Sequence, residues 1–541
     1  MQLFNRAIIL GLFFAAVQFL FSSCAAKVPA GKLKVTVFGA AEQVSGSMTL
    51  MEVSGKKILI DCGLFYPDDG DGSLANRQEA ADDKNEALPI KAESLDAVII
   101  THAHLDHIGR VPLLVESGFN GKIFCTQATK DILDVMLISQ IRYDNRERNW
   151  VFSKSSIKTG QDGHPYVTAH WNNCKWQKNI KQTNLQIYKG HRTDAEEKFE
   201  VQFSPCKLCA ENTLAKIIPH LSVRDFDIPF DIDPGLKVTY LYSGHIPGSA
   251  SVLLEVNPGE GNPKKLLFSG DLGNSVGLLQ NGPAPAPEVD ALWVESTYGG
   301  ISREIDAEEE LVRFRKDIAD ALNNDGIAWI PAFALDRTQK ILFEISEAKK
   351  SGIIPDHVQV FCPSPSAHEI SKHYIEELKN KQNWFKPEIY LKDNVFSAYS
   401  REFLNEIPRP AILITTSGMM DAAYSAMLGK KLLPDSSVTV FLVGYQDPGT
   451  PGGQIKSGQK FVEWKDEEIT VNARVNDYKS FSAHPDAREL EEWLSRQNKE
   501  TTAIFLVHGN LPALEAQKNL LESIGFKNVI IPKEGAVSLL F

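Results

Sequence analysis

The segment Thr101-His102-Ala103-His104-Leu105-Asp106-His107 constrains this chain of 541 residues more than any other segment. It follows a short apolar run and places four side chains with nitrogen or oxygen ligand atoms within six positions. Zinc prefers imidazole nitrogens and carboxylate oxygens. We therefore expect a tight turn after a strand that presents His102 and His104 to one ion and Asp106 and His107 to a second. The alternative, a polar surface turn, does not account for so many ligand-type residues together.

Three further residues stand where an apolar strand runs into a glycine-containing turn: His245 in YSGHIPGSAS, Asp271 in LLFSGDLG and His508 in AIFLVHGN. Each of them alone is more often a satisfied loop residue than a ligand. Together with the histidine segment they complete the number of ligands that a two-metal site needs, with one carboxylate to bridge the ions.

The alternation of short apolar runs with helical patterns predicts an α/β fold. From about 140 to 235 the chain is polar and irregular, which predicts an insertion with small hairpins of its own; a flap over the metal site is the alternative. After Glu295, strands and helices alternate again, as in a second α/β domain with a parallel sheet. The final residues look like a return to the first domain.

The net charge of −12 argues against a broad cationic face that would coat a nucleic acid. Recognition of phosphate must therefore be local. Bound zinc can supply such local positive charge.

The N-terminus reads as an export signal. Arg6 precedes a mainly apolar run from Ala7 to Phe21, too short for a confident membrane span. Ser22 and Ser23 before Cys24 resemble a relaxed bacterial lipobox, in which Cys24 becomes the lipidated first residue. An uncleaved anchor and a cytoplasmic location remain the alternatives.

Cysteines after this segment are too sparse for a disulfide framework. Cys206 and Cys209, with Cys174 and His170 upstream, could form a zinc knuckle or a local disulfide. We favour unligated or disulfide cysteines, since only one CxxC pair is present.

The motifs HAHLDH, SGHIPGSAS, FSGDLG and ILIDCG resemble the successive motifs of metallo-β-lactamase-fold hydrolases. The later segments ALWVESTYG, PAFALDRTQ, TTSGMMDAAYS, FSAHPD and LVHGN resemble the beta-CASP branch of that family. This branch includes bacterial ribonuclease J and the endonuclease of messenger-RNA 3′-end processing. The resemblance covers the chain from about residue 33 to its end.

The resemblance implies a metallo-β-lactamase αββα sandwich with an inserted beta-CASP α/β domain. The expected parts are a lipoprotein-type signal peptide (1–24), a first metallo-β-lactamase part (33–300), the beta-CASP domain (301–479) and a second metallo-β-lactamase part (480–541).

By the same resemblance two zinc ions are bound. One takes His102, His104 and His245, the other takes Asp106, His107 and His508, and Asp271 bridges them. Asp61 would orient the metal-binding loop from behind the ligands.

A two-metal hydroxide mechanism would then cleave phosphodiester bonds of nucleic acid, with RNA the favoured substrate. His484, by resemblance, would donate a proton to the leaving oxygen while Glu295 holds its ring; the alternative is that His484 merely caps the following helix. Ser417, Gly418 and Arg337 are weaker candidates for gripping a phosphate, because a turn or a helix start explains them equally well.

The competing function is an exported hydrolase of a small ester, thioester or phosphodiester on the same fold. A closed or acidic groove between the domains would favour it. Whether cutting is internal or from an end, and whether the chain forms a homodimer, is left open.

Overall fold

The computed structural model describes residues 33–67, 73–144, 207–257, 262–275, 277–303, 306–379, 407–464 and 467–540, together with six strands between 149 and 202. The expected signal segment with Cys24 lies outside the described residues, and so does Cys206. The side chains of His170, Cys174 and Cys209 are not described either, so the predicted cysteine site stays a prediction. Among the helices that are described, none is both long and apolar enough to cross a membrane.

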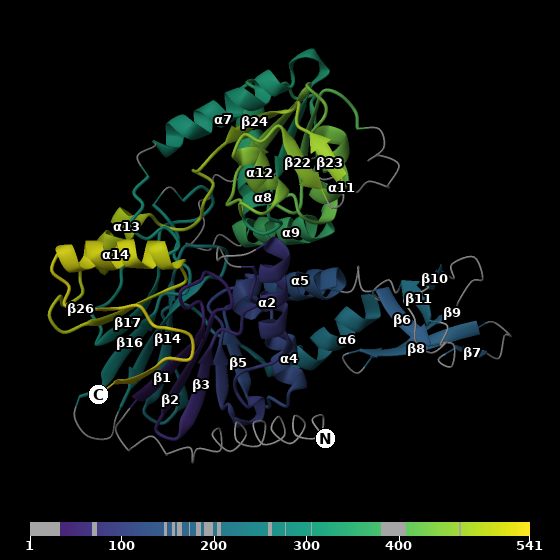
Figure 1. Cartoon of the computed structure of the whole chain (residues 1–541). Helices are drawn as coiled ribbons and strands as arrows, with labels where there is room; N and C mark the ends of the chain where they lie inside the picture. Colours follow the sequence, from purple (N-terminus) through teal and green to yellow (C-terminus); the bar gives the residue numbers. More distant parts are fainter. Residues whose placement is uncertain are drawn as a thin grey trace, which may run out of the picture.

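Two seven-stranded sheets pack against each other in the lower half of the molecule as drawn in Figure 1. The first sheet has the order β12 (Leu221–Val223), β5 (Lys122–Cys125), β4 (Ala97–Ile99), β3 (Lys56–Ile60), β2 (Met48–Val53), β1 (Leu33–Gly39) and β27 (Val537–Leu540). The second has the order β13 (Phe230–Asp233), β14 (Leu236–Tyr242), β15 (Ala250–Val256), β16 (Lys264–Phe268), β17 (Ala291–Glu295), β25 (Ala503–Val507) and β26 (Asn528–Ile530). The end of the chain therefore adds strands to both sheets, as expected.

A continuous apolar core lies between the two sheets. It joins side chains of β1 to β5 with side chains of β14 to β17 and β25. On neighbouring strands of the second sheet, the rings of Phe268, Trp293 and Phe505 stack with centroids 4.5 and 4.6 Å apart. Stacked rings bury a large apolar area, so this row fixes the spacing of the strands whose ends form the site described below.

Helices cover the outer face of each sheet. Two helices, α4 (Val111–Glu116) and α5 (Gln127–Asp144), pack on the first sheet. Two others, α13 (Ala487–Leu494) and α14 (Leu511–Ser523), pack on the second through Trp493, Leu514 and their apolar neighbours. The result is the four-layer αββα arrangement that the family resemblance implies.

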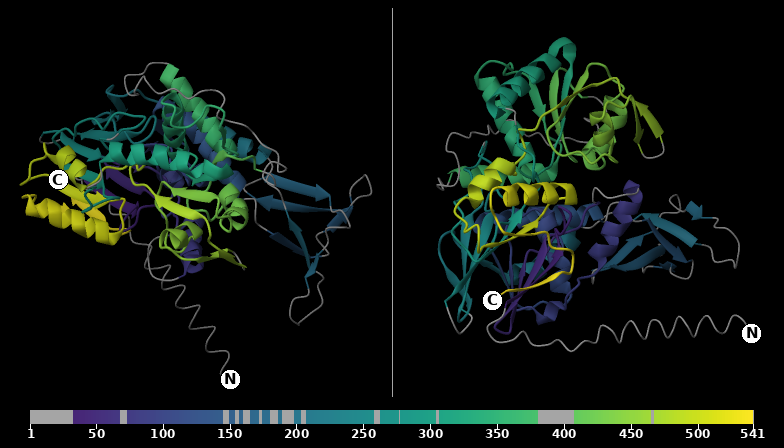
Figure 2. Two further views of the ribbon diagram at one scale, coloured as in Figure 1. Left: turned by 90° about the horizontal axis from the view of Figure 1, so that it is seen from above. Right: turned by 60° about the vertical axis from the view of Figure 1, so that its left-hand side comes forward.

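The second domain is built on a five-stranded parallel sheet. Its order is β19 (Gln359–Phe361), β20 (Ala411–Thr415), β18 (Ile327–Pro331), β21 (Val438–Leu442) and β24 (Arg474–Asp477). Its central strands are apolar on both faces because both are covered. One face packs on α7 (Ala307–Ala321), α8 (Arg337–Lys350) and α9 (Pro365–Lys379), the other on α11 (Ala423–Leu432) and α12 (Pro451–Lys456). The right-hand view of Figure 2 also shows this domain stacked on the double sheet.

The polar insertion forms two small antiparallel sheets that project from the first domain (Figure 1). One contains β7 (Ile157–Thr159), β8 (Pro165–Trp171) and β9 (Cys174–Asn179); the other contains β10 (Gln186–Tyr188), β11 (Lys198–Gln202) and β6 (Asn149–Ser153). The predicted end of the insertion, at about 235, is wrong. The strand β12 already pairs in parallel with β5, and three residues are too few to show an apolar period in sequence.

Candidate metal centre

Four strands of the second sheet deliver polar residues to one edge. Strands β16, β17 and β25 are mutually parallel, and β14 runs in the same direction because two antiparallel pairings through β15 separate it from β16. Their carboxyl ends are followed or closed by His245, Asp271, Glu295 and His508. In open α/β sheets, ligands bind at this edge. Strand β4 of the facing sheet brings the histidine segment to the same place.

The histidine turn is held by the loop that follows β3. The carboxylate of Asp61 accepts the backbone N–H of Thr101 at 2.8 Å and approaches Nδ1 of His107 at 2.7 Å. Gly63 permits the loop to lie against the turn, because a Cβ there would stand 1.5 Å from the carbonyl oxygen of Asp106. Asp61 thus contacts the histidine turn at Thr101 and His107 and belongs to neither cluster of ligand atoms described next.

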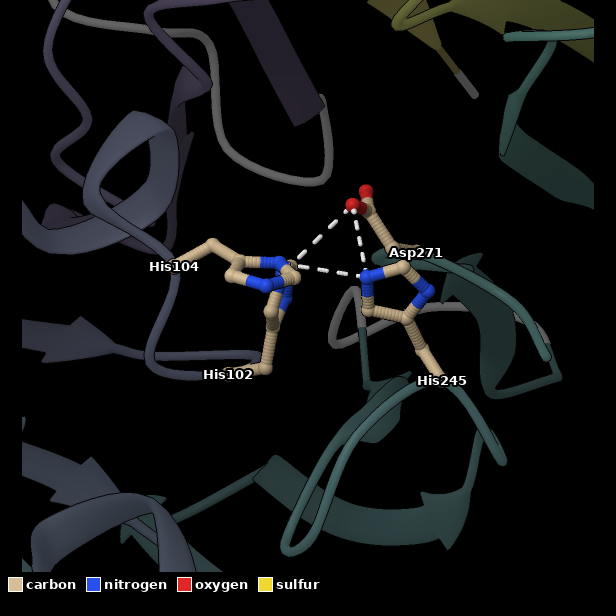
Figure 3. Close-up of side chains that lie close together, drawn as sticks. All are labelled: His102, His104, His245 and Asp271. Atoms are coloured by element: carbon tan, nitrogen blue, oxygen red, sulfur yellow. Dashed lines mark hydrogen bonds and ion pairs between the residues drawn. The ribbon is translucent and has the colours of Figure 1, made fainter. Parts of the chain in front are cut away.

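The first cluster of ligand atoms consists of His102, His104, His245 and one oxygen of Asp271 (Figure 3). Nδ1 of His104 lies 3.0 Å from Nε2 of His102 and 3.1 Å from Nε2 of His245. Oδ2 of Asp271 lies 3.4 Å from Nε2 of His102 and 3.5 Å from Nε2 of His245. The four atoms thus surround one point.

The second cluster consists of Asp106, His107 and His508. The Nε2 atoms of His107 and His508 are 3.3 Å apart, and Oδ2 of Asp106 lies 3.4 Å from Nε2 of His508. The other oxygen of Asp271, Oδ1, faces this cluster at 3.2 Å from His107 and 3.4 Å from His508. Asp271 therefore presents one oxygen to each cluster.

These residues fit a pair of zinc ions. Ligands about 2.0–2.1 Å from a tetrahedral ion stand about 3.3 Å from one another, close to the spacings in both clusters. Oδ1 of Asp271 is buried and accepts no hydrogen bond from any described residue. A buried carboxylate oxygen without a donor is costly, and a cation between the clusters would satisfy it.

Electrostatics supports the same conclusion. Burial lowers the pKa of the His104 ring to about 3, and it also lowers the pKa of His102 and of His245. These rings are therefore neutral near pH 7 and keep a lone pair for a metal. Burial alone would lower the pKa of His107 too, but the nearby carboxylates of Asp271, Asp61 and Asp106 raise it well above its usual value. Three carboxylates at one edge attract a cation.

His484 stands beside the two clusters without belonging to either. Its ring centroid lies 4.6 Å from that of His245 and 5.8 Å from that of His508. Its Nδ1 atom lies 2.9 and 3.0 Å from the two carboxylate oxygens of Glu295. The capping alternative fails, because the side chain that caps α13 is Asp486.

Thr297 connects this pair to the second cluster, and the sequence reasoning did not single it out. Its hydroxyl donates to Glu295 at 2.8 Å and lies 3.3 Å from Nδ1 of His484 and 3.1 Å from Nδ1 of His508. The available signal was its place in ESTYG, two residues after a carboxylate at the end of a strand.

A cavity of about 800 Å³ lies between the two domains, next to His484. Arg337 lines it, as does Arg303, whose guanidinium donates to the backbone carbonyl of His484. The lining contains the basic residues Arg303, Arg337, Lys456, Lys479 and Arg488 and the acidic residues Asp477, Asp486, Glu489 and Glu492. The cavity is thus not predominantly acidic.

Ser417 and Gly418 do not line this cavity. The hydroxyl of Ser417 donates to Asp421, and the carbonyl oxygen of Gly418 accepts a hydrogen bond from Gln446 at 3.0 Å. Of the three residues that the sequence suggests for gripping a phosphate, Arg337 alone is among those that line this cavity.

Comparison with known families matches most of the chain in three parts. Residues 41–298 match the metallo-beta-lactamase superfamily, residues 338–455 match the Beta-Casp domain, and residues 468–532 match the Zn-dependent metallo-hydrolase RNA specificity domain.

Individual relatives are similar over almost the same length. The transcription termination factor FttA of Methanocaldococcus jannaschii is 26% identical over 500 residues, which is 88% of this chain and 67% of that protein. FttA of Methanosarcina mazei is 28% identical over 499 residues, with the same coverage. A ribonuclease of Thermus thermophilus is 26% identical over 502 residues, which is 90% of this chain and 96% of that protein.

Proposed function

Because this chain belongs to the beta-CASP family of metallo-β-lactamase-fold nucleases, which are metal-dependent hydrolases, we propose that it cleaves phosphodiester bonds of RNA with two zinc ions. The observation that carries the proposal is the position of the Glu295–His484 pair beside both clusters of metal ligands. A proton donor next to a two-metal site suits a reaction with a poor leaving group, such as a ribose oxygen.

The metal ions would supply two things when bound: activation of a water molecule near neutral pH and neutralisation of charge on the phosphate oxygens. The protein's own contribution is to fix seven ligand side chains on the turns, and on the short helix α3 (Leu105–Ile108), that follow buried strands. Asp271, with an oxygen toward each cluster, would set the separation of the two ions.

His484 would act as the general acid. Its Nδ1 atom faces the carboxylate of Glu295, so Nε2 is the nitrogen that remains to deliver a proton to the leaving oxygen. Glu295 orients the ring through contacts of Nδ1 with both carboxylate oxygens. Through Oε1 it also accepts the backbone N–H of Leu272 at 2.8 Å, which ties the acid to the loop of Asp271.

RNA is the favoured substrate for two reasons. One of the matched families is described as an RNA specificity domain, and one relative of nearly the same length is a ribonuclease. The mixed charge of the cavity provides local cations on a chain of net charge −12, so phosphates can be recognised there without a broad basic face.

The test is cleavage of end-labelled single-stranded RNA and DNA by the purified protein. His484→Ala is compared with wild type at equal zinc content, and His357→Ala, at an exposed histidine, is the matched control. We expect a loss of about 10²–10⁴-fold in kcat for His484→Ala and none for the control.

The same experiment separates the alternatives. Cleavage of RNA but not DNA fixes the substrate, and the labelled products separate internal from terminal cutting. Absence of cleavage by the wild-type protein with two zinc ions bound would reject the nuclease and favour hydrolysis of a small ester, thioester or phosphodiester.

We also propose that the chain is exported and anchored through a lipid on Cys24. The support is the apolar run from Ala7 to Phe21 followed by Ser22-Ser23-Cys24. Incorporation of a labelled fatty acid by wild type, and none by Cys24→Ser, is the expected result. Equal labelling of the two proteins, or an unlabelled wild type in the cytoplasmic fraction, would reject the anchor.

A further inference from the structure

Arg337 carries a charge that its surroundings do not neutralise by contact. Its Nη1 atom is buried and has no hydrogen-bond partner among the described residues. The carboxylate of its neighbour in the sequence, Asp336, pairs with Nζ of Lys340 at 2.7 Å and accepts a hydrogen bond from the hydroxyl of Tyr374 at 3.4 Å. Burial, together with repulsion from Arg303, lowers the pKa of Arg337. A buried guanidinium nitrogen without an acceptor is costly unless a ligand supplies one.

Two further donors in the same cavity lack partners. Nε of Arg303 is buried without an acceptor, although Nη2 of the same side chain donates to the carbonyl oxygen of His484. The guanidinium of Arg303 stands over the ring of Tyr298, 5.1 Å from its centroid, which fixes its orientation. Ser482 is 6% exposed, and its hydroxyl has no partner in the described part of the chain. All three residues line the cavity.

Three of the four acidic residues of the cavity, all except the exposed Glu492, already have partners among the described residues. Asp486 accepts the backbone N–H groups of Arg488 and Glu489 at the start of α13, and that of Arg303. Glu489 accepts the backbone N–H of Ser275 at 2.6 Å, and Asp477 pairs with Lys456 at 3.2 Å. None of these three carboxylates accepts a hydrogen bond from the side chain of Arg337 or Arg303. The part of the cavity that contains these arginines therefore has buried donor atoms without acceptors among the described residues.

We propose that Arg337, Arg303 and Ser482 form an anion site that holds a backbone phosphate next to the scissile one. The inference rests on the proposed function, since the phosphate belongs to the same RNA strand. An arginine pair with a hydroxyl offers several donors to the two free oxygens of a phosphodiester.

The position of the site relative to His484 decides which phosphate it holds. The scissile phosphate must lie within reach of the metal ligands and of the ring of His484. Arg303 instead donates to the backbone carbonyl of His484, and it lines the cavity whereas His484 does not. The site therefore belongs to a neighbouring phosphate, and the strand would be held on both sides of the acid, which aligns the scissile bond.

The experiment uses short RNA substrates in which one linkage at a time is replaced by an uncharged methylphosphonate. For wild type, we expect one position flanking the scissile bond at which removal of the charge raises KM about tenfold, with a smaller effect on kcat. The same substrates are then given to Arg337→Gln. Arg496→Gln, at an exposed arginine outside the cavity, is the matched control.

We expect Arg337→Gln to raise KM for the unmodified RNA about tenfold and to abolish the penalty of the sensitive methylphosphonate, because that penalty requires the arginine. Arg496→Gln should behave as wild type. If no flanking position is sensitive in wild type, or if the penalty persists in Arg337→Gln, the anion site is wrong while the nuclease stands. A wild-type protein that cleaves no RNA would overturn both.

Discussion

Arg77 and Asp447, 370 residues apart in the chain, join the two domains by a bidentate ion pair. The guanidinium donates from Nη1 and Nη2 to the two carboxylate oxygens at 2.7 and 3.0 Å. Arg77 belongs to α2 (Leu74–Glu86) of the first domain, and Asp447 follows β21 of the second. The two side chains are only 9% and 6% exposed, so solvent screens their attraction little.

Removal of one partner should therefore destabilise the protein. We expect Arg77→Ala to lower the free energy of unfolding by about 3 kcal/mol, because Asp447 would remain buried without its counter-charge. Denaturation by urea, followed by tryptophan fluorescence, measures the change. Lys372→Ala, which removes an exposed pair with Glu369, should cost less than about 0.5 kcal/mol. Equal effects of the two variants would contradict the buried pair.

The same ion pair should make stability depend on pH. Burial alone would raise the pKa of Asp447, but hydrogen bonds from Arg77 and from the backbone of Gly449 lower it below its usual value. A lowered folded-state pKa gives stability that is present above the unfolded value of about 3.9 and is lost as pH falls through the folded value. The difference in melting temperature between wild type and Asp447→Asn should thus shrink below about pH 4. Parallel curves would contradict this.

The number of bound zinc ions should depend on which cluster of ligands a substitution removes. His245 is a member of the first cluster alone, whereas Asp271 faces both. We expect about two zinc ions per chain in wild type, about one in His245→Ala, and weakened retention of both in Asp271→Asn. Elemental analysis after dialysis gives the numbers. Loss of both ions in His245→Ala would show that the clusters are not independent.

Asp61 should influence zinc without touching it. In Asp61→Asn, a neutral amide would replace the carboxylate that orients His107 and Thr101. We expect zinc affinity to fall about 10–100-fold, measured by competition with a chelator. Asp227→Asn is the control, since Asp227 is exposed and has the same backbone φ of 59°. Unchanged affinity in Asp61→Asn would reject the supporting role.

Glu295 should act through His484. In Glu295→Gln the ring loses its charged partner, and we expect kcat to fall about 10²-fold while KM for RNA changes less than about threefold. Zinc content is measured on the same samples. Glu500→Gln, at an exposed glutamate, should leave both constants unchanged. A rise in KM and a fall in kcat together with loss of zinc would indicate that Glu295 mainly supports the loop of Asp271.

Part of the site could be predicted from the sequence because several of its residues are close together in the chain. His102, His104, Asp106 and His107 lie within one turn, and the apolar run before them predicts the strand that carries them. Helix α8 (Arg337–Lys350) lies in the stretch after Glu295 where the sequence predicts alternating strands and helices. The end of the insertion was misplaced because β12 shows itself as a strand only by pairing with β5.

The sequence by itself determined the types of ligand residue at the centre and the α/β class, because ligand type and apolar period are properties of neighbouring residues. Only the tertiary structure decided which distant groups meet: Thr297 with His484, Arg303 with the backbone of His484, and Arg77 with Asp447. Such contacts depend on strand order and on the packing of one domain against the other. Neither leaves a periodic trace in the sequence, since each contact joins single residues across hundreds of positions.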